Sequence, residues 1–486
     1  MKIRINALPG WAAALLTGAL FAISRDLGPI GALVLIAPIP ILVFALQSDR
    51  VLSVAVYAFI ARVIGMLGFV IAYANVFPVP VLVSALAIYG LEFALIIVLT
   101  RFVAARLSTV LSVLSYPVLL TASERLLQAA SPHGSFGALG YSLVDILPIA
   151  QLASLGGVAT LSFLAALIPM GISVSITNRT NWRAAMITAA VPVILAIGFG
   201  LWRLNEPYES EARVALGAID ALTSQSVKDA THADEVATAY ASLVKQIAES
   251  DLARPLSIVL PEKVFALRRG WDSKAIEILQ QAADQANVTI VAGFDEETEP
   301  RHYANAARVF SPRSDMLRYV KRKLIPGVES RFTPGREPLL SSGNGIAICK
   351  DLDFPMLLRE YGNRTPLMLV PGWDFVTDGE LHSRMAVLRG IENGFAVARA
   401  AAMGRLTVSD AFGRIVAEKI TDPSSASWIT TTIGLVNIRT LYTRFGDLFA
   451  WFMITSAAVM ILASATKFRS SIRGHTRPMV ERSAAS

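Results

Sequence analysis

Long apolar runs fill most of the first 200 residues of this 486-residue chain, and one more lies near its end. A helix that crosses a bilayer needs about 20 mostly apolar residues, because lipid offers the backbone no hydrogen-bond partners. Seven such runs lie at about 7–24, 28–46, 51–75, 78–100, 107–123, 146–177 and 184–202, and an eighth at about 446–466. We therefore expect a polytopic α-helical membrane bundle of about eight spans, whose first helix is not a cleaved signal peptide.

Charges in the short connections predict the orientation of these spans. Basic residues fall on alternate connections: Lys2 and Arg4, Arg50, Arg101 and Arg106, Arg179 and Arg183. The positive-inside rule places this set in the cytoplasm, so that seven spans leave the following segment outside and the eighth returns the tail. The predicted domains are a seven-span membrane domain (1–203), an outer domain (204–443), an eighth span (444–466) and a basic cytoplasmic tail (467–486). This topology accounts for the net charge of +7, and we expect no nucleic-acid partner.

In the outer domain, apolar strand-like runs alternate with helix-like stretches, which is typical of α/β folds. We expect strands at 212–219, 257–260, 288–294, 304–310, 345–349, 366–370 and 396–401. Helices are expected at about 227–249, 272–287, 354–362 and 379–394. Residues 409–414 predict a hairpin turn.

Cys349 is the only cysteine of the chain and ends one of these apolar runs. It can form no intrachain disulfide, and a thiol at a strand end lies at a sheet edge, where clefts form. Taken alone, an unpaired cysteine in an apolar run is more often a small core residue. Two other strand-like runs also end in an ionisable residue, Glu262 and Lys321, and this shared pattern favours a reactive thiol.

These three residue types meet the needs of a cysteine nucleophile. A thiol with its ordinary pKa of about 8.5 is mostly protonated at neutral pH, so that it needs a base such as Glu262. The oxygen of an attacked carbonyl gains negative charge, which Lys321 and backbone N–H groups can stabilise. Glu262, Lys321 and Cys349 are therefore the candidate catalytic residues. The five histidines show no spacing typical of a metal site, and we expect neither a metal nor a cofactor.

The order of these residues and the strings around them resemble the nitrilase or carbon-nitrogen hydrolase superfamily. Residues 319–326 followed by Glu329 resemble its lysine motif with an additional glutamate, and 378–404 resembles the stretch after its nucleophile. In the membrane part, 123–142 and 148–157 resemble the connection between the fifth and sixth spans of apolipoprotein N-acyltransferases. The chain thus resembles a divergent member of that family, the membrane-bound branch of the superfamily.

The resemblance implies a four-layer α-β-β-α nitrilase-like sandwich for the outer domain. It also implies an N-acyltransferase that moves a phospholipid acyl chain through a Cys349 thioester to the N-terminal amine of a diacylglyceryl-cysteine lipoprotein. Such a protein is expected in the bacterial inner membrane as a multi-pass monomer, with its catalytic domain on the periplasmic side. Glu329, Asp351 and Trp373 are expected to support the triad or to bind substrate.

Each of these residues also has a purely structural interpretation. Glu262 can cap the following segment, and Lys321 can belong to a solvated basic face. Glu329 can simply pair with a neighbouring base. Asp351 can cap a helix near residue 354, and Trp373 can be either a cleft wall or a lipid-facing aromatic.

Four strings depart from the family pattern, at 134–137, 326–329, 350–351 and 370–374. These are cleft and lid positions, so that alternatives to the implied substrates stay open. One is a membrane-tethered amidase of the nitrilase superfamily, in which water resolves the acyl-enzyme. Another is an acyltransferase with a different amine acceptor. A lipid-binding pseudoenzyme is a third, which the intact Glu262, Lys321 and Cys349 disfavour.

Overall fold

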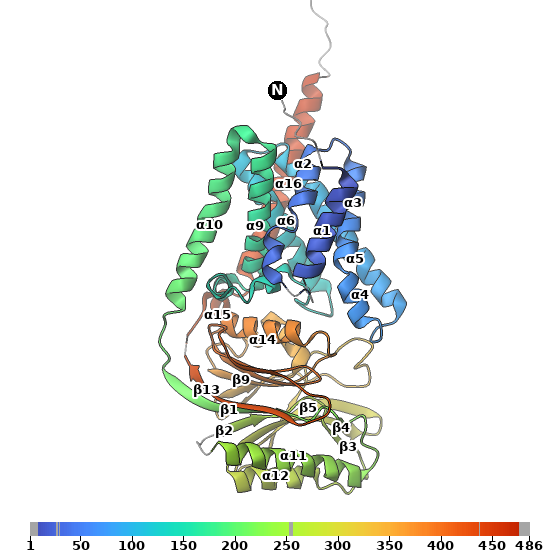
Figure 1. Cartoon of the computed structure of the whole chain (residues 1–486), viewed down its shortest axis with the longest axis vertical. Helices are drawn as coiled ribbons and strands as arrows, with labels where there is room; N and C mark the ends of the chain where they lie inside the picture. The colour runs from blue at the N-terminus through green and yellow to red at the C-terminus, as the bar shows by residue number, and fades with distance from the viewer. Residues whose placement is uncertain (1–7, 26–27, 29, 252–255, 437, 476–486) are drawn as a thin grey trace, which may run out of the picture. The chain divides into compact units, whose positions relative to one another are not determined.

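The computed structural model describes residues 8–475 except 26–27, 29, 252–255 and 437 (Figure 1). The chain divides into two compact units, each built from separate stretches. A helical unit contains residues 1–126, 162–194 and 448–486, and an α/β unit contains residues 127–161 and 195–447.

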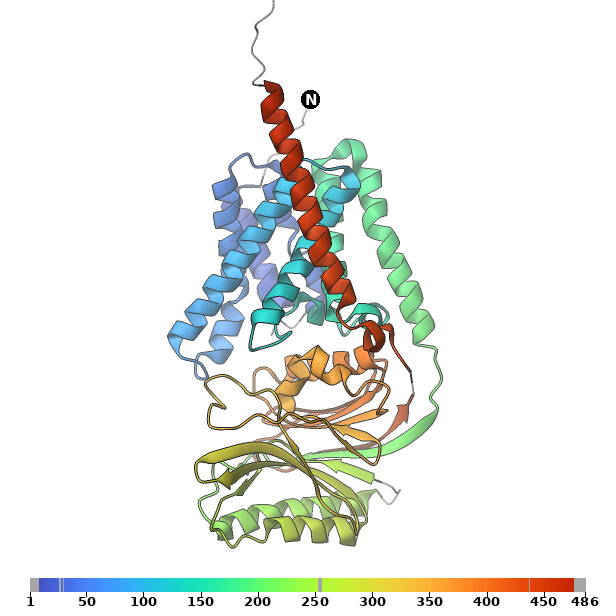
Figure 2. The same cartoon turned by 180° about the vertical axis from the view of Figure 1, so that it is seen from behind.

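The helical unit consists mainly of apolar helices. They are α1 (Gly10–Ser24), α2 (Ile39–Gln47), α3 (Val51–Gly65), α4 (Leu67–Tyr73), α5 (Val79–Ala104), α6 (Thr109–Ala130), α9 (Val158–Thr177), α10 (Trp182–Arg203) and α16 (Leu448–His475). Helices α6, α9 and α10 each run from one unit into the other. Figure 2 shows α16 as one long, continuous helix.

Within the described residues, five helices are long and apolar enough to cross a membrane: Val79–Ala104, Thr109–Ala130, Val158–Thr177, Arg179–Arg203 and Leu448–Arg469. The pair α3 and α4, bent by 41°, is a sixth if it counts as one span. The predicted runs at 7–24 and 28–46 coincide with shorter apolar helices, Gly10–Ser24 and Gly31–Gln47. The prediction of several apolar helices in the N-terminal region is confirmed, and the number of eight spans stays a prediction.

The predicted run at 146–177 is wrong as a single helix. Two one-turn helices, α7 (Leu147–Ala150) and α8 (Ala153–Gly156), precede α9. Gly157 separates α8 from α9 with φ +70°, a left-handed conformation that a residue with a side chain rarely adopts. A Cβ there would also lie 2.7 Å from the Tyr442 ring. Both the backbone conformation and the lack of space therefore favour glycine at position 157.

Two sheets form the centre of the α/β unit. The first has the order β13-β1-β2-β4-β5-β6, with β3 paired to β4. Its strands are β1 (Ser210–Ala218), β2 (Leu256–Val259), β3 (Phe265–Leu267), β4 (Thr289–Glu299), β5 (His302–Phe310), β6 (Leu317–Val320) and β13 (Ser427–Leu435). The second has the order β12-β11-β10-β9-β8-β7. Its strands are β7 (Leu339–Ser341), β8 (Asn344–Ile346), β9 (Leu367–Trp373), β10 (Ala396–Ala402), β11 (Arg405–Ser409) and β12 (Ile415–Ile420).

Three apolar cores hold these sheets and their helices together. One joins the first sheet to α11 (Ala230–Ser250) and α12 (Ala275–Ala286), whose ribbons lie along its outer face in Figure 1. The second contains side chains from both sheets, such as Val259 and Leu369. The third joins the second sheet to α13 (Pro355–Arg359) and α14 (Gly379–Asn393). Strands β2 and β9 are buried along nearly their whole length, as expected for parallel strands covered on both faces.

The prediction of an α/β C-terminal domain with sheets is confirmed. The hairpin at 409–414 connects β11 to β12, and the four expected helices match α11, α12, α13 and α14. The expected strand at 345–349 is too long, since β8 ends at Ile346 and a 3₁₀ helix begins at Cys349. Strands β3, β7 and β13 were not predicted.

The connection between α6 and α9 packs into the α/β unit. The Tyr141 hydroxyl accepts a hydrogen bond of 2.9 Å from Arg389 of α14. The Gln151 amide donates to the Phe412 carbonyl at 2.8 Å. The Val158 N–H donates to the Glu392 carboxylate at 2.8 Å, so that three buried bonds tie this connection to α14 and to the β11–β12 turn.

Candidate active site

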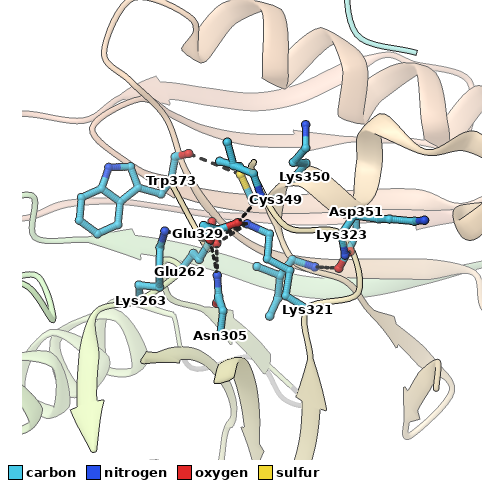
Figure 3. A network of polar contacts seen from close by, with 12 residues as sticks. Glu262, Lys263, Asn305, Lys321, Lys323, Glu329, Cys349, Lys350, Asp351 and Trp373 are labelled. Carbon is cyan, nitrogen blue, oxygen red and sulfur yellow. Dashed lines mark hydrogen bonds and ion pairs between the residues drawn. The ribbon is translucent and has the colours of Figure 1, made fainter. Parts of the chain in front are cut away.

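Three side chains from three strand ends converge inside the α/β unit (Figure 3). Glu262 follows β2, Lys321 follows β6 directly, and Cys349 opens the 3₁₀ helix Cys349–Asp353 after β8. Their exposed fractions are 1%, 0% and 6%. Because water is excluded here, the charges interact far more strongly than they would at the surface.

The backbone around Glu262 is fixed from two sides. Its N–H donates to the Gly372 carbonyl of β9 at 3.1 Å, which ties the base to the second sheet. On the other side lies Gly293 of β4, where a Cβ would stand 2.4 Å from the Glu262 Cα. A glycine at position 293 is therefore required for the close approach of these two segments.

Lys321 lies between two carboxylates. Its Nζ is 2.7 Å from Glu262 Oε1, and 3.1 and 2.9 Å from the two oxygens of Glu329. Burial by itself lowers the pKa of a lysine, but the two carboxylates outweigh burial and hold the pKa of Lys321 well above its usual value. Lys321 is therefore a fixed cation at this site.

Glu329 stays ionised beside this cation. Burial favours its neutral form, but Lys321 and Lys263 together lower the pKa of Glu329 below its usual value. The Ile325 N–H also donates to Glu329 Oε2 at 2.9 Å. Glu329 thus orients Lys321 and anchors the loop that follows it.

Two residues of this network were missed by sequence reasoning. Asn305 of β5 donates from its amide to Glu262 at 2.5 Å and to Glu329 at 2.8 Å. Lys263 places its Nζ 3.1 Å from Glu329 and 3.9 Å from Glu262. The signal that the sequence offers for Asn305 is a polar residue between Ala304 and Ala306, and it is weak because such a residue also has common structural explanations.

Cys349 has a strained backbone and a protonated thiol. Its φ of +39° lies in the left-handed region, which is unfavourable for a residue with a Cβ and recurs at functional sites. Burial raises the pKa of the thiol above its usual value, and the nearby Glu262 carboxylate raises it further, although Lys321 opposes both. The thiol lies 3.4 Å from the Trp373 carbonyl, which accepts its hydrogen bond.

Asp351 connects the turn of Cys349 to the loop of Lys321, instead of capping a helix near residue 354. One carboxylate oxygen accepts from the Tyr319 hydroxyl at 2.7 Å and from the Ile348 N–H at 3.0 Å. The other accepts from the N–H groups of Arg322 at 3.1 Å and Lys323 at 2.8 Å. Burial raises the pKa of Asp351 to about 6, so that the carboxylate is largely ionised at neutral pH.

Trp373 lies at the end of β9 on the wall of the site. Its side chain is half-buried, and the Lys263 Nζ lies 5.4 Å from its ring centre. The next residue, Asp374, forms a buried ion pair with Arg399, a pair that sequence reasoning also missed. This pair holds the end of β9 against β10 and thereby positions the Trp373 carbonyl.

The structure brings all six predicted site residues together. The cluster supplies a carboxyl group that can act as the base, a fixed cation and a buried thiol, which are the groups needed to attack a carbonyl carbon and to stabilise the resulting oxyanion. Within the described residues, no group of three His, Cys, Asp or Glu side chains is arranged to hold a metal ion.

Two family models match the chain. The apolipoprotein N-acyltransferase N-terminal domain matches residues 17–171, and carbon-nitrogen hydrolase matches residues 254–442. Among the relatives, the apolipoprotein N-acyltransferase of Geobacter metallireducens is 27% identical over 92% of this chain and 94% of that protein. The one from Bradyrhizobium diazoefficiens is 26% identical over 72% of each chain.

Among solved structures, a CN-hydrolase superfamily protein from Xanthomonas campestris is similar to part of this chain. It is 20% identical with a TM-score of 0.39, and the match covers 46% of this chain and 91% of the other. One family match falls on the helical N-terminal region and the other on the region around Cys349, and the Geobacter relative is similar along most of the chain. The chain is a divergent member of the apolipoprotein N-acyltransferase family.

Proposed function

We propose that this protein is an N-acyltransferase that uses Glu262, Lys321 and Cys349 as its catalytic residues. In this proposal an acyl chain moves from a membrane phospholipid to the N-terminal amine of a diacylglyceryl-cysteine lipoprotein. The observation that carries the proposal is the buried Lys321–Glu262 contact of 2.7 Å beside the Cys349 thiol, in a chain whose membrane part matches the same family. The names of the relatives support the choice of substrates.

In the first half-reaction Glu262 takes the thiol proton while the Cys349 sulfur attacks an ester carbonyl carbon of the phospholipid. A C–S bond forms, and the developing oxyanion is stabilised by Lys321 and backbone N–H groups. The oxyanion then collapses, the ester C–O bond breaks, and Glu262 returns its proton to the departing alkoxide. The products are a thioester on Cys349 and a lysophospholipid.

In the second half-reaction the lipoprotein amine attacks the thioester carbonyl. Glu262 accepts a proton from the amine nitrogen, the C–S bond breaks, and an amide forms. The thiolate recovers a proton from Glu262, which restores the starting state. Glu329 and Asn305 do not react in this scheme but hold Glu262 and Lys321 in place.

The membrane setting completes the proposal. The family and the apolar helices point to a protein of the bacterial inner membrane. We place the α/β region, predicted as 204–443, on the periplasmic side, and we assign its two sheets and flanking helices to the four-layer nitrilase sandwich. The seven-span segment 1–203, the last span at 444–466 and the basic tail at 467–486 retain their predicted roles. We propose a monomer that requires no cofactor and no nucleic acid.

Intact mass spectrometry of the purified full chain tests this proposal. Exposure to a phospholipid with defined acyl chains should add one acyl mass to the wild-type protein and none to Cys349→Ser, because a serine hydroxyl has a much higher pKa than a thiol. Adding a diacylglyceryl-cysteine peptide should remove the adduct and yield the N-acylated peptide. Undiminished acylation of Cys349→Ser contradicts the assigned nucleophile. Rapid release of free fatty acid without the peptide favours the amidase-like alternative.

A further inference from the structure

A cavity of about 780 Å³ lies on the α/β unit and is lined in part by the two residues that follow Lys321. Its lining residues are Arg322, Lys323, Gly335, Arg336, Phe354, Met356, Leu357, Arg359, Glu360 and Thr443. None of the six predicted site residues belongs to this lining. Four of the lining side chains are cationic and one is a carboxylate, so that the cavity is strongly basic.

The single carboxylate does not neutralise this charge. Glu360 forms two hydrogen bonds with Arg322, at 2.8 and 3.1 Å, and is fully engaged with it. Lys323 and Arg336 form no ion pair with any residue that the structure describes. The Lys323 Nζ instead lies 4.5 Å from the ring centre of Phe354. Two cationic heads are therefore available to an anionic ligand, as in sites that recognise phosphate.

Arg359 is held in the lining of the cavity by α15 (Leu441–Phe445). Its guanidinium donates 2.9 Å hydrogen bonds to the carbonyls of Thr443 and Arg444 in this helix. Thr443 is five residues before Leu448, where α16 begins, and five extended residues reach at most about 18 Å. If α16 is a membrane span, the cavity therefore lies within reach of the lipid headgroups.

The lining of the cavity is apolar as well as basic. Phe354, Met356 and Leu357 belong to it, and Met356 is 45% exposed. Exposed apolar side chains beside cations are typical of surfaces that bind the headgroup region of anionic lipids. A site for a small soluble anion would gain nothing from these apolar side chains.

We propose that this cavity binds the phosphate of an anionic glycerophospholipid through Lys323, Arg336 and Arg359, at a site separate from the acyl-transfer centre. Lys323 and Arg336 pair with the phosphate oxygens, while Met356 and Phe354 contact the glycerol and the start of the acyl chains. The inference depends on the membrane location proposed above and not on the chemistry of Cys349. Occupancy would hold the adjoining Lys321 loop close to the bilayer surface.

Binding of dihexanoyl phosphatidylglycerol to the full-length Cys349→Ser protein in detergent tests the inference, because this variant removes the acyl-transfer reaction. Microscale thermophoresis should detect binding that weakens roughly tenfold in Lys323→Gln/Arg336→Gln, the effect of losing one to two charge-assisted hydrogen bonds. The matched control is Lys228→Gln/Arg313→Gln, which removes two exposed cations elsewhere on the same unit and should bind like the parent. Lys323→Arg should also retain binding.

Two further ligands separate the possible sources of binding. Dihexanoylglycerol, which lacks the phosphate, should bind at least tenfold more weakly than the phospholipid. Inorganic phosphate should compete only at far higher concentration. Equal affinity of the parent and the Lys323→Gln/Arg336→Gln protein overturns the site, and equal affinity for dihexanoylglycerol overturns the role of the phosphate. Tight competition by inorganic phosphate overturns the lipid assignment. None of these results depends on whether acyl transfer occurs.

Discussion

The Asp351 side chain connects the segment that carries Cys349 to the loop that follows Lys321. Its two oxygens accept four hydrogen bonds, two of them from the loop that follows Lys321 and one from the residue before Cys349. A substitution of Asp351 should therefore change the positions of both Cys349 and Lys321.

Asp351→Asn should slow formation of the acyl-enzyme by about tenfold or more. The amide nitrogen of asparagine cannot accept hydrogen bonds, so that two of the four groups that donate to Asp351 lose their acceptor. The free energy of unfolding should fall by about 1–3 kcal/mol for the same reason. Single-turnover mass spectrometry and thermal unfolding measure the two effects. Glu337→Gln, which removes an exposed carboxylate in the same region, is the control. An unchanged rate in Asp351→Asn excludes the positioning role.

Trp373→Ala should slow acylation by phospholipid more than it slows discharge of the thioester to a small soluble amine. The reason is that the indole forms a wall of the site and has Lys263 against its face, whereas the catalytic groups do not depend on it. Measuring both half-reactions separately checks this expectation. Equal slowing of the two steps would instead indicate a general loss of structure.

Among single residues, the sequence predicted those catalytic candidates that lie at the end of a strand. Glu262, Lys321 and Cys349 stood out because each ends an apolar run with an ionisable group. Asn305 and Lys263 did not, since a polar residue in mid-strand and a lysine next to a glutamate have common structural explanations. Their roles depend on which strands become neighbours, and spacing along the chain does not contain that information.

At the scale of elements, α14 is unusual because it carries a buried ion pair on the face that meets the α6–α9 connection. Arg389 lies 3.0 Å from Glu392, and both side chains are fully buried. Burial raises the pKa of Glu392 to about 7, although Arg389 opposes the shift. This helix is therefore sensitive to pH near neutrality.

The pH dependence follows from the direction of that shift. Because the folded-state pKa of Glu392 lies above its unfolded value, folding takes up a proton between about pH 4.5 and 7, and this contribution to stability is lost as pH rises through that window. The melting temperatures of the wild-type protein and of Glu392→Gln should both be measured from pH 4.5 to 7.5. The wild-type value minus the Glu392→Gln value should decrease as the pH rises. A difference that stays constant with pH rules out titration of Glu392 as the cause.

Most of the longer helices and strands were predicted from periodicity, although the nine-residue strand β13 was missed. Strands β3 and β7 have three residues each, too few for an alternating pattern. The strand expected to reach Cys349 stops at Ile346, because the left-handed backbone at Cys349 ends the extended conformation. This conformation is set by the packing around the thiol, so that it could not be predicted from the residue types of the segment.

At the scale of the whole molecule, the alternation of basic connections predicts the orientation. Reporter fusions at about residue 230 should be active outside the cytoplasm, and fusions near residue 475 should be active inside it. Alkaline phosphatase and green fluorescent protein fusions report the two sides. Finding both positions on the same side would remove one of the eight predicted spans.

The attachment of residues 127–161 to the α/β unit has a consequence for how the protein is made. The bonds Arg389–Tyr141, Gln151–Phe412 and Val158–Glu392 join residues 248, 261 and 234 positions apart. Contacts between residues so distant in the chain form late, because the whole intervening segment must first be synthesised and brought back. Ser135 likewise donates to the carbonyl of Asp353, at the end of the 3₁₀ helix that Cys349 opens, and this bond requires synthesis to pass residue 353. A ribosome that stalls between residues 353 and 389 therefore leaves a chain that contains the thiol but lacks the three bonds to α14 and to the β11–β12 turn.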